Sequence, residues 1–367
     1  MTVATEVRAG ELAALIAGAE VIVTCGPGGV GKTTTAAALG LAAARAGRRV
    51  VVVTIDPARR LADALGIEES TDEPHRVVGA TKGAPRRGGA FSALMLDAER
   101  TFDRLVIDRA GDRADAILAN PVYRSIAGSL GGAQEYMAIE RLHELVAGSE
   151  FDLVVVDTPP SRHAIDVLEA PDRLVRFLSH PVYRALTLPG RSFARVTNAA
   201  TTAFVWTVKR LAGPSIVEDT VEFFRSISGM EAGLRQRAAE VATVLRSERT
   251  AFVLVSSPRA EAIDESAFMA GALAAGGFRL GAVVVNLVHP LIDELAMSTD
   301  EPPVSSPLAD QLAYHRELRS LALAERDEIE ALTAAAGDVV VVEVPLLDHD
   351  VHDIAALTEI GTLLGLG

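Results

Sequence analysis

One short segment restricts what this chain can fold into more than any other feature of its sequence. Residues Gly26 to Thr33 read GPGGVGKT and satisfy the pattern G-x-x-x-x-G-K-[ST]. The apolar run VIVT precedes the segment and an alanine-rich stretch follows it, as expected for a strand, a glycine-rich turn and a helix. Glycines let consecutive backbone N–H groups converge on one phosphate, and the helix directs its positive end toward the same point. The segment therefore predicts a phosphate loop that binds a nucleotide.

Individual positions of this loop have expected roles. The ammonium of Lys32 is expected to neutralise oxygens of the β- and γ-phosphates, and the hydroxyl of Thr33 is expected to bind Mg²⁺. Thr34, in the first turn of the helix, is expected to reach the α-phosphate. The residues of the segment expected to contact the nucleotide are Gly28, Gly29, Val30, Gly31, Lys32, Thr33 and Thr34.

Short runs of β-branched residues recur along the chain, separated by helix-like segments, and a weaker apolar run lies at residues 91–96. Most of them are continuously apolar, which is typical of parallel strands covered on both faces. The alternation of such strands with helices predicts an α/β fold with a doubly wound, mostly parallel sheet. The expected strands lie at residues 21–24, 50–55, 91–96, 153–157, 252–256, 282–286 and 339–344.

Two aspartates end expected strands, at the edge of the sheet where ligands of such folds bind. Asp157 ends the run LVVVD, where it is expected to hold Mg²⁺ through water beside the phosphate loop. Asp56 follows the second strand, where a carboxylate can orient or deprotonate the water that attacks the terminal phosphate. Each has a simpler alternative: Asp157 caps a strand end, and Asp56 is the N-cap of a helix that begins at Pro57.

The alternation is interrupted between about residues 165 and 246, where no convincing strand occurs. Residues 165–235 hold seven of the chain's 16 aromatic residues. This pattern predicts an inserted helical subdomain at 165–246, between the two parts of a P-loop domain at 1–164 and 247–367. The aromatic residues form either the small core of this subdomain or an apolar surface that binds a client.

Several motifs together resemble one family of ATPases. The segments GPGGVGKTT, DPARRLADALG, DTPPSRHAIDVL, VVVNLV and VPLL occur here in the order found in the ArsA-type ATPases. These include arsenical-pump ATPases and the guided-entry ATPases that carry tail-anchored membrane proteins. The resemblance spans Val21 to about Leu364, and it implies a P-loop NTPase of the deviant Walker-A (SIMIBI) class that hydrolyses ATP with Mg²⁺.

The resemblance also implies roles for individual residues. Asp56 would activate the attacking water in switch I, and Asp157 would open switch II. Asn286 would hydrogen-bond the adenine, and the loop with Pro345 and Leu346 would cover the base. The inserted helices would bind an apolar protein or lipid-like client, and two subunits would hold the nucleotides between them.

The phosphate loop departs from the family pattern G-K-G-G-x-G-K-T at one position. The first lysine of that pattern reaches the partner's phosphates, whereas this chain has Pro27, which offers neither a charge nor an N–H. Losing a cation that acts on the transition state costs orders of magnitude in rate. The sequence therefore favours a heterodimer with a lysine-bearing paralogue over a homodimer. A slow nucleotide switch, or substitution by Arg59, Arg60 or Arg162, stays open.

Composition and charge exclude other classes of protein. The 49 acidic residues outnumber the 35 basic ones, so bulk attraction to nucleic acid or to an anionic membrane is not expected. The single cysteine, Cys25, cannot form an intrachain disulfide or a zinc ribbon. The sequence has no signal-peptide pattern and no apolar run of ~18 residues. We therefore expect a cytoplasmic protein without an integral membrane segment.

The main prediction is a dimeric ATPase whose nucleotide cycle opens and closes a helical client-binding subdomain. Two alternatives use the same motifs. A positioning ATPase of the partition or septum-site type has a similar loop, but such proteins often end in a basic amphipathic helix, and the tail DIAALTEIGTLLGLG has no lysine or arginine. A weakly hydrolysing, nucleotide-dependent scaffold subunit is suggested by Pro27.

Overall fold

The computed structural model describes residues 3–55, 60–65, 73–86, 88–120, 123, 133–160, 162–179, 231–292 and 307–367. The strands in these ranges are β1 (Val21–Cys25), β2 (Arg49–Thr54), β3 (His75–Arg76), β4 (Ala90–Met95), β5 (Leu153–Asp157), β6 (Thr250–Ser256), β7 (Leu280–Val288) and β8 (Val340–Pro345). The helices there are α1 (Val3–Gly18), α2 (Lys32–Arg45), α3 (Arg60–Leu65), α4 (Ala98–Ala110), η1 (Gly111–Arg113), α5 (Ala114–Ala119), α7 (Ala133–Ala147), α8 (Arg162–Ser179), α13 (Glu231–Leu245), α14 (Ala260–Ala275), α15 (Pro307–Ala336) and α16 (Ile354–Leu363).

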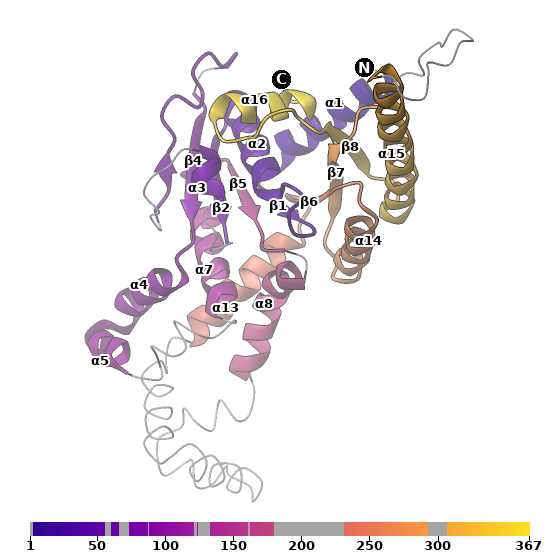
Figure 1. The fold of residues 1–367 in the computed structure, drawn as a ribbon. Helices are drawn as coiled ribbons and strands as arrows, with labels where there is room; N and C mark the ends of the chain where they lie inside the picture. Colours follow the sequence, from indigo (N-terminus) through magenta and orange to yellow (C-terminus); the bar gives the residue numbers. More distant parts are fainter. Residues whose placement is uncertain are drawn as a thin grey trace, which may run out of the picture.

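The eight strands form one sheet in the order β3-β4-β2-β5-β1-β6-β7-β8, with helices on both of its faces (Figure 1). Neighbouring strands run parallel except for β3 and β4, which are antiparallel. The doubly wound, mostly parallel sheet predicted from the sequence is thereby confirmed. Strand β3 was not predicted, because its two exposed residues carry none of the apolar pattern that marks the other strands.

Two apolar cores flank the sheet, because successive side chains of a strand point to opposite faces. In β2, Val50 and Val52 pack into the core that α2 and α16 cover. Val51 and Val53 pack into the core on the other face, beneath α7, α8, α13, α14 and α15. The strands therefore need apolar residues at nearly every position, which is why they lack the alternation of a half-exposed sheet.

The parallel strands bring the predicted site residues to one edge of the sheet. The carboxyl ends of β1, β2 and β5 lie next to one another, because the register pairs Thr24 with Asp157 and Asp157 with Thr54. The phosphate loop follows β1, and Asp157 is the last residue of β5. Asp56 lies two residues beyond the end of β2, outside the described residues.

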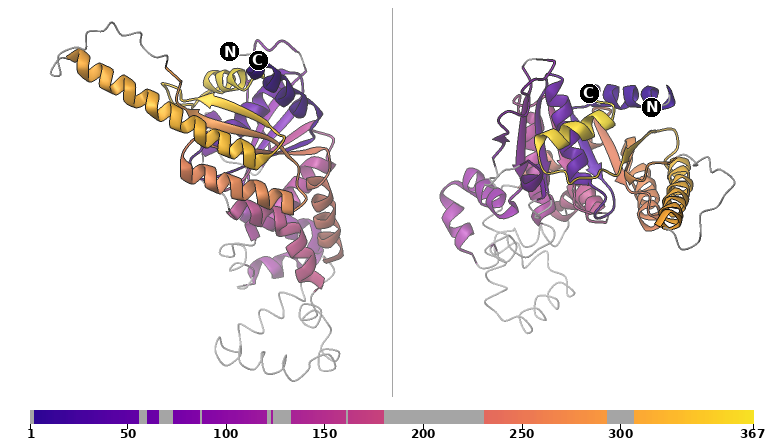
Figure 2. Two further views of the ribbon diagram at one scale, coloured as in Figure 1. Left: turned by 90° about the vertical axis from the view of Figure 1, so that its right-hand side faces the viewer. Right: turned by 45° about the horizontal axis from the view of Figure 1, so that its top comes forward.

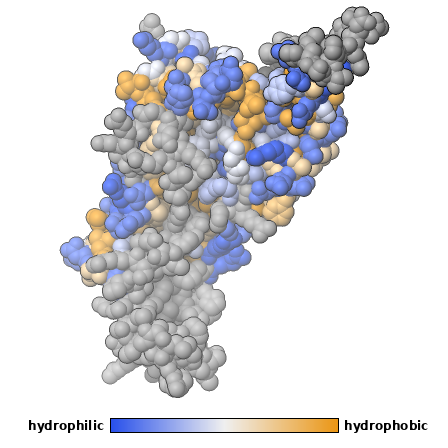
Figure 3. Space-filling model, in the orientation of Figure 1, coloured by the Kyte–Doolittle hydropathy of each residue, from blue (hydrophilic) through white to orange (hydrophobic). Residues whose placement is uncertain are grey.

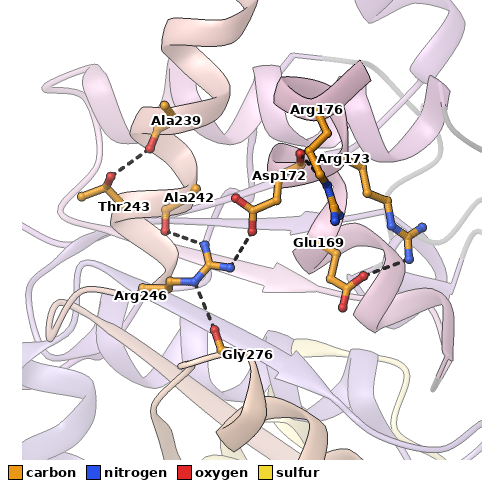
Figure 4. Close-up of polar contacts among 9 residues, drawn as sticks. All are labelled: Glu169, Asp172, Arg173, Arg176, Ala239, Ala242, Thr243, Arg246 and Gly276. Atoms are coloured by element: carbon orange, nitrogen blue, oxygen red, sulfur yellow. Dashed lines mark hydrogen bonds and ion pairs between the residues drawn. The ribbon is translucent and has the colours of Figure 1, made fainter. Parts of the chain in front are cut away.

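Two described helices, α8 and α13, belong to the predicted insertion and pack against each other on one face of the sheet (Figure 1). Arg246, directly after α13, joins them to the rest of the fold (Figure 4). Its guanidinium donates to Asp172 of α8 at 2.7 Å and to the Gly276 carbonyl oxygen at 3.1 Å, and it lies 4.8 Å from the centre of the Phe278 ring. These contacts hold the base of the predicted insertion on the ATPase domain.

The middle of the predicted insertion, residues 180–230, lies outside the described residues, together with six of its seven aromatic residues. The parts that are described, 165–179 and 231–245, are helical. The domain boundaries at 164 and 247, and the choice between an internal core and a client surface, stay predictions.

The opposite end of the sheet carries the longest described helix. Figure 2 shows α15 lying alongside α14 and extending beyond it. Exposed apolar side chains on this pair of helices include Phe268 and Tyr314. On the face of the molecule drawn in Figure 3, hydrophobic residues are interspersed with hydrophilic ones. Among the helices that the structure describes, none combines the length and the apolar character needed to cross a bilayer.

Candidate nucleotide site

The phosphate loop forms the turn from β1 into α2 at the carboxyl edge of the sheet (Figure 1). Lys32 begins α2, and its side chain folds back so that Nζ donates to the Pro27 carbonyl oxygen at 2.7 Å. Only 6 % of Lys32 is exposed, so its ammonium lies inside the loop. A phosphate oxygen is a stronger acceptor for an ammonium than a peptide carbonyl. The arrangement therefore suits the predicted role of Lys32 in binding phosphate.

The sharp turn of the loop requires glycine at two positions. Gly26 has a φ of 145°, and a Cβ atom there would overlap the carbonyl oxygen of Val255 in β6. Gly31 has a φ of 92°, and a Cβ atom there would overlap the side-chain amide of Asn286. The loop thus packs against β6 and β7 at points where a side chain has no room.

We expect Gly26→Ala to lower the free energy of unfolding by at least about 3 kcal/mol, because a strained backbone and a clash with buried backbone coincide. Gly29→Ala is the matched control: its φ is 75°, but a Cβ atom there meets nothing within 4 Å. Strain alone should cost that variant about 1–2 kcal/mol. Urea unfolding of both variants measures the difference, and equal stabilities would contradict the importance of the contact with Val255.

A buried carboxylate connects the loop to the centre of the sheet. Asp157 is fully buried, and its Oδ2 accepts hydrogen bonds from the hydroxyls of Thr33 at 2.7 Å and Thr54 at 3.0 Å. The Thr158 hydroxyl donates to the Thr24 carbonyl oxygen at 2.8 Å, which fixes the chain directly after Asp157. Hydroxyl and carboxylate oxygens are hard ligands of the kind that Mg²⁺ prefers. Thr33 and Asp157 therefore fit the predicted magnesium site.

The end of β7 brings Asn286 onto the phosphate loop. Its Nδ2 donates to the Val30 carbonyl oxygen at 3.0 Å, 256 residues away along the chain. A bulge between Val285 and Val288, with Leu287 at a φ of 65°, produces this placement. Because the Val30 carbonyl oxygen can only accept, Asn286 uses its amide nitrogen for this bond. Its Oδ1 can then accept a hydrogen bond from another donor, such as the amino group of adenine. The contact with Val30 was not predicted, and the contact with adenine stays a prediction.

The segments beyond β7 and β8 are tied together. The Leu346 backbone N–H donates to the Val288 carbonyl oxygen at 2.9 Å, so the loop after Pro345 begins beside the end of β7. Directly after β7, His289 contacts Glu325 of α15. The Glu325 carboxylate accepts a hydrogen bond from the His289 backbone N–H at 2.8 Å and lies 2.7 Å from Nδ1 of the His289 ring. Nothing in the sequence signalled this pair. The role of Pro345 and Leu346 in covering the base stays a prediction.

Cys25 is a core residue although it directly precedes the phosphate loop. It is fully buried in β1, and burial raises the pKa of its thiol to about 12, with a smaller opposite effect from Lys32. A thiol of this kind stays protonated at neutral pH and is a poor nucleophile.

The structure brings together Lys32, Thr33, Asp157 and Asn286, whereas other predicted residues are not placed. Asp56 and Arg59 lie outside the described residues. Arg60 and Arg162 occur in α3 and α8, whose course is described although the side chains of these two residues are not. The predicted substitutes for the missing lysine therefore stay predictions.

Comparison with known proteins identifies the family. The family model described as anion-transporting ATPase (ArsA) matches residues 19–365. The chain belongs to the ArsA ATPase family. An uncharacterized protein of Streptomyces coelicolor is 30 % identical over 292 residues, which cover 80 % of this chain and 66 % of that protein.

Two further relatives of this ArsA-family chain are named ATPases. ATPase GET3 of Malassezia globosa is 26 % identical over 343 residues, which cover 92 % of this chain and 88 % of that protein. ATPase GET3B of Arabidopsis thaliana is 25 % identical over 354 residues, which cover 92 % of this chain and 77 % of that protein. Membership of this family makes the chain an ATP hydrolase of the ArsA type.

Proposed function

We propose that this ArsA-family ATPase binds Mg²⁺-ATP at the turn between β1 and α2 as a cytoplasmic dimer. Its nucleotide cycle would open and close the dimer, so that the inserted helices bind and release an apolar protein or lipid-like client. The observation that carries the nucleotide part is the buried Asp157 carboxylate, which bonds Thr33 at 2.7 Å beside Lys32. This pairing places hydroxyl, carboxylate and ammonium groups at one end of the loop.

The residues of the chain divide the chemistry among them. Lys32 and the backbone N–H groups of the loop would bind the phosphates, Thr33 would bind Mg²⁺, and Asp157 would hold the ion through water. When bound, the cation neutralises charge on the β- and γ-phosphates. Asp56 would orient the attacking water and accept its proton. Asn286 would accept a hydrogen bond from adenine through Oδ1.

Continuity of the chain supports a link from the nucleotide to the insertion. Asp157 ends β5, and α8 begins only five residues later at Arg162. A change around the terminal phosphate would therefore displace the start of the helix that leads into residues 180–230. The bonds from Arg246 to Asp172 and Gly276 would hold the middle of α8 on the fold, so that the helix tilts about that point. The aromatic content of the insertion supports an apolar client.

The dimer that we propose is a heterodimer with a lysine-bearing paralogue, and Pro27 is its motivation. The Pro27 ring offers no charge to a partner, and the carbonyl oxygen of Pro27 bonds the chain's own Lys32. The site of this chain would receive a lysine from the paralogue, whereas two copies of this chain would lack it at both sites.

We expect Pro27→Lys to raise the rate of phosphate release by the purified chain at least about tenfold, because a cation returns to the transferred phosphate. Pro27→Ala is the control, since it removes the ring without adding a charge. Steady-state phosphate release measures both. If the wild-type chain and Pro27→Lys hydrolyse ATP equally fast, the heterodimer loses its basis.

The proposed function is tested by titration of the folded chain with ATP and ADP in the presence of Mg²⁺. We expect binding of both nucleotides, and the absence of any binding would refute the proposal. Affinity isolation from native cells, once with ATP and once with ADP, tests the partners. A paralogous subunit and a client that is retained with only one of the nucleotides are expected.

A further inference from the structure

Thr54 lies beside the proposed magnesium site and has no role in the function described so far. It is the last residue of β2 and is 1 % exposed. Its hydroxyl donates to Asp157 Oδ2 at 3.0 Å, and the same oxygen accepts the bond from Thr33. One carboxylate oxygen thus binds two hydroxyl donors that come from different elements, β2 and α2.

Strand β1, which lies on the other side of β5 from β2, offers a natural comparison. Thr24 of β1 and Thr54 of β2 both pair in register with Asp157, so the three side chains stand in one row on the same face of the sheet. Thr24 is as deeply buried as Thr54. Its hydroxyl, however, donates to the Val156 carbonyl oxygen at 3.3 Å. Of these two threonines, Thr54 is the one whose hydroxyl bonds the carboxylate.

We propose that Thr54 is a positioning residue for the Mg²⁺ of the bound nucleotide. The terminal torsion of an aspartate side chain is broad, so each hydrogen bond to the carboxylate restricts its rotation. The bond from Thr54 adds a second donor to Oδ2 and fixes the plane of the Asp157 carboxylate beside the Thr33 hydroxyl. Residues that orient a metal ligand in this way typically change metal affinity 10- to 100-fold when they are lost. The inference rests on the proposed binding of Mg²⁺ and nucleotide.

Three variants of the full chain test this role. Thr54→Val removes the hydroxyl at nearly constant volume, Thr54→Ser keeps it, and Thr24→Val removes an equally buried hydroxyl that does not bond Asp157. The probe is Mg²⁺, titrated against the affinity for a fluorescent, non-hydrolysable ATP analogue. We expect Thr54→Val to raise the Mg²⁺ concentration for half-maximal effect about 10- to 100-fold. Affinity for the analogue without Mg²⁺ should stay unchanged, and the other two variants should resemble the wild type.

Two results would overturn the role of Thr54. One is a wild-type Mg²⁺ dependence in Thr54→Val; the other is an equal shift in Thr24→Val, which would assign the effect to the loss of any buried hydroxyl. If Thr54→Val does not fold, Thr54→Ala takes its place with the same expected shift and the same refuting result. Failure of the proposed function looks different, because the wild-type chain would then show no Mg²⁺-dependent nucleotide binding at all.

Discussion

Replacing Lys32 with alanine is expected to lower the rate of ATP hydrolysis at least about 1,000-fold and to weaken ATP binding. Lys32 is the only charged residue among the eight of the phosphate loop, and only 6 % of its surface is exposed. Its Nζ already bonds an oxygen of the loop, so the ammonium is directed inward before any phosphate is bound. Because Pro27 occupies the position of the family's other lysine, alanine would leave the loop without a cation.

Phosphate release and nucleotide titration measure this effect, and Lys82→Ala controls for the loss of a positive charge elsewhere. Lys82 is exposed in the turn after β3, remote in sequence from the loop, and its replacement should leave hydrolysis within about twofold of the wild type. Thermal unfolding of both variants shows whether the loop stays folded without the Lys32–Pro27 bond. A rate for Lys32→Ala within tenfold of the wild type would mean that phosphates are bound elsewhere.

The elements nearest the phosphate loop could be predicted because their signals are local. A strand, a glycine-rich turn and an alanine-rich helix follow one another within 25 residues, and each predicted apolar run is a strand of the sheet. The rule that ligands bind at the carboxyl edge of a doubly wound sheet predicted that the phosphate loop and Asp157 lie at the same edge. The meeting of Thr33 with Asp157, 124 residues apart, is the result that this rule anticipates.

The contacts that hold this site in shape could not be predicted, because they depend on register and on irregular backbone. Whether Thr54 or Thr24 bonds Asp157 is decided by the directions of two hydroxyls in adjacent strands. The bond from Asn286 to Val30 needs a bulge with a leucine in the left-handed region, a conformation for which a leucine gives no signal. The pairing of Glu325 with His289 joins a helix to a strand end 36 residues away.

Replacing Asp56 with asparagine is expected to separate binding from hydrolysis. Asparagine has nearly the same shape as aspartate but cannot accept the proton of the attacking water, so the rate of phosphate release should fall about 100- to 10,000-fold. Lys32, Thr33 and Asp157 remain, and the affinity for ATP with Mg²⁺ should stay within about threefold of the wild type. This pattern differs from that of Lys32→Ala, in which both quantities fall.

The same Asp56→Asn variant decides between the ATPase cycle and the nucleotide-dependent scaffold. In a cycle driven by hydrolysis, the variant should accumulate in the ATP-bound state and retain its partner and client where the wild-type chain releases them. In a scaffold, the wild-type chain would already release phosphate as slowly as the variant, and its partners would not change. Asp152→Asn is the control for the loss of a carboxylate. Asp152 is exposed directly before β5 and bonds Arg49 at the opposite edge of the sheet. Rapid phosphate release that is equal in the wild type, Asp56→Asn and Asp152→Asn would leave Asp56 without a catalytic role. The simpler function of a helix N-cap would then explain its position before Pro57.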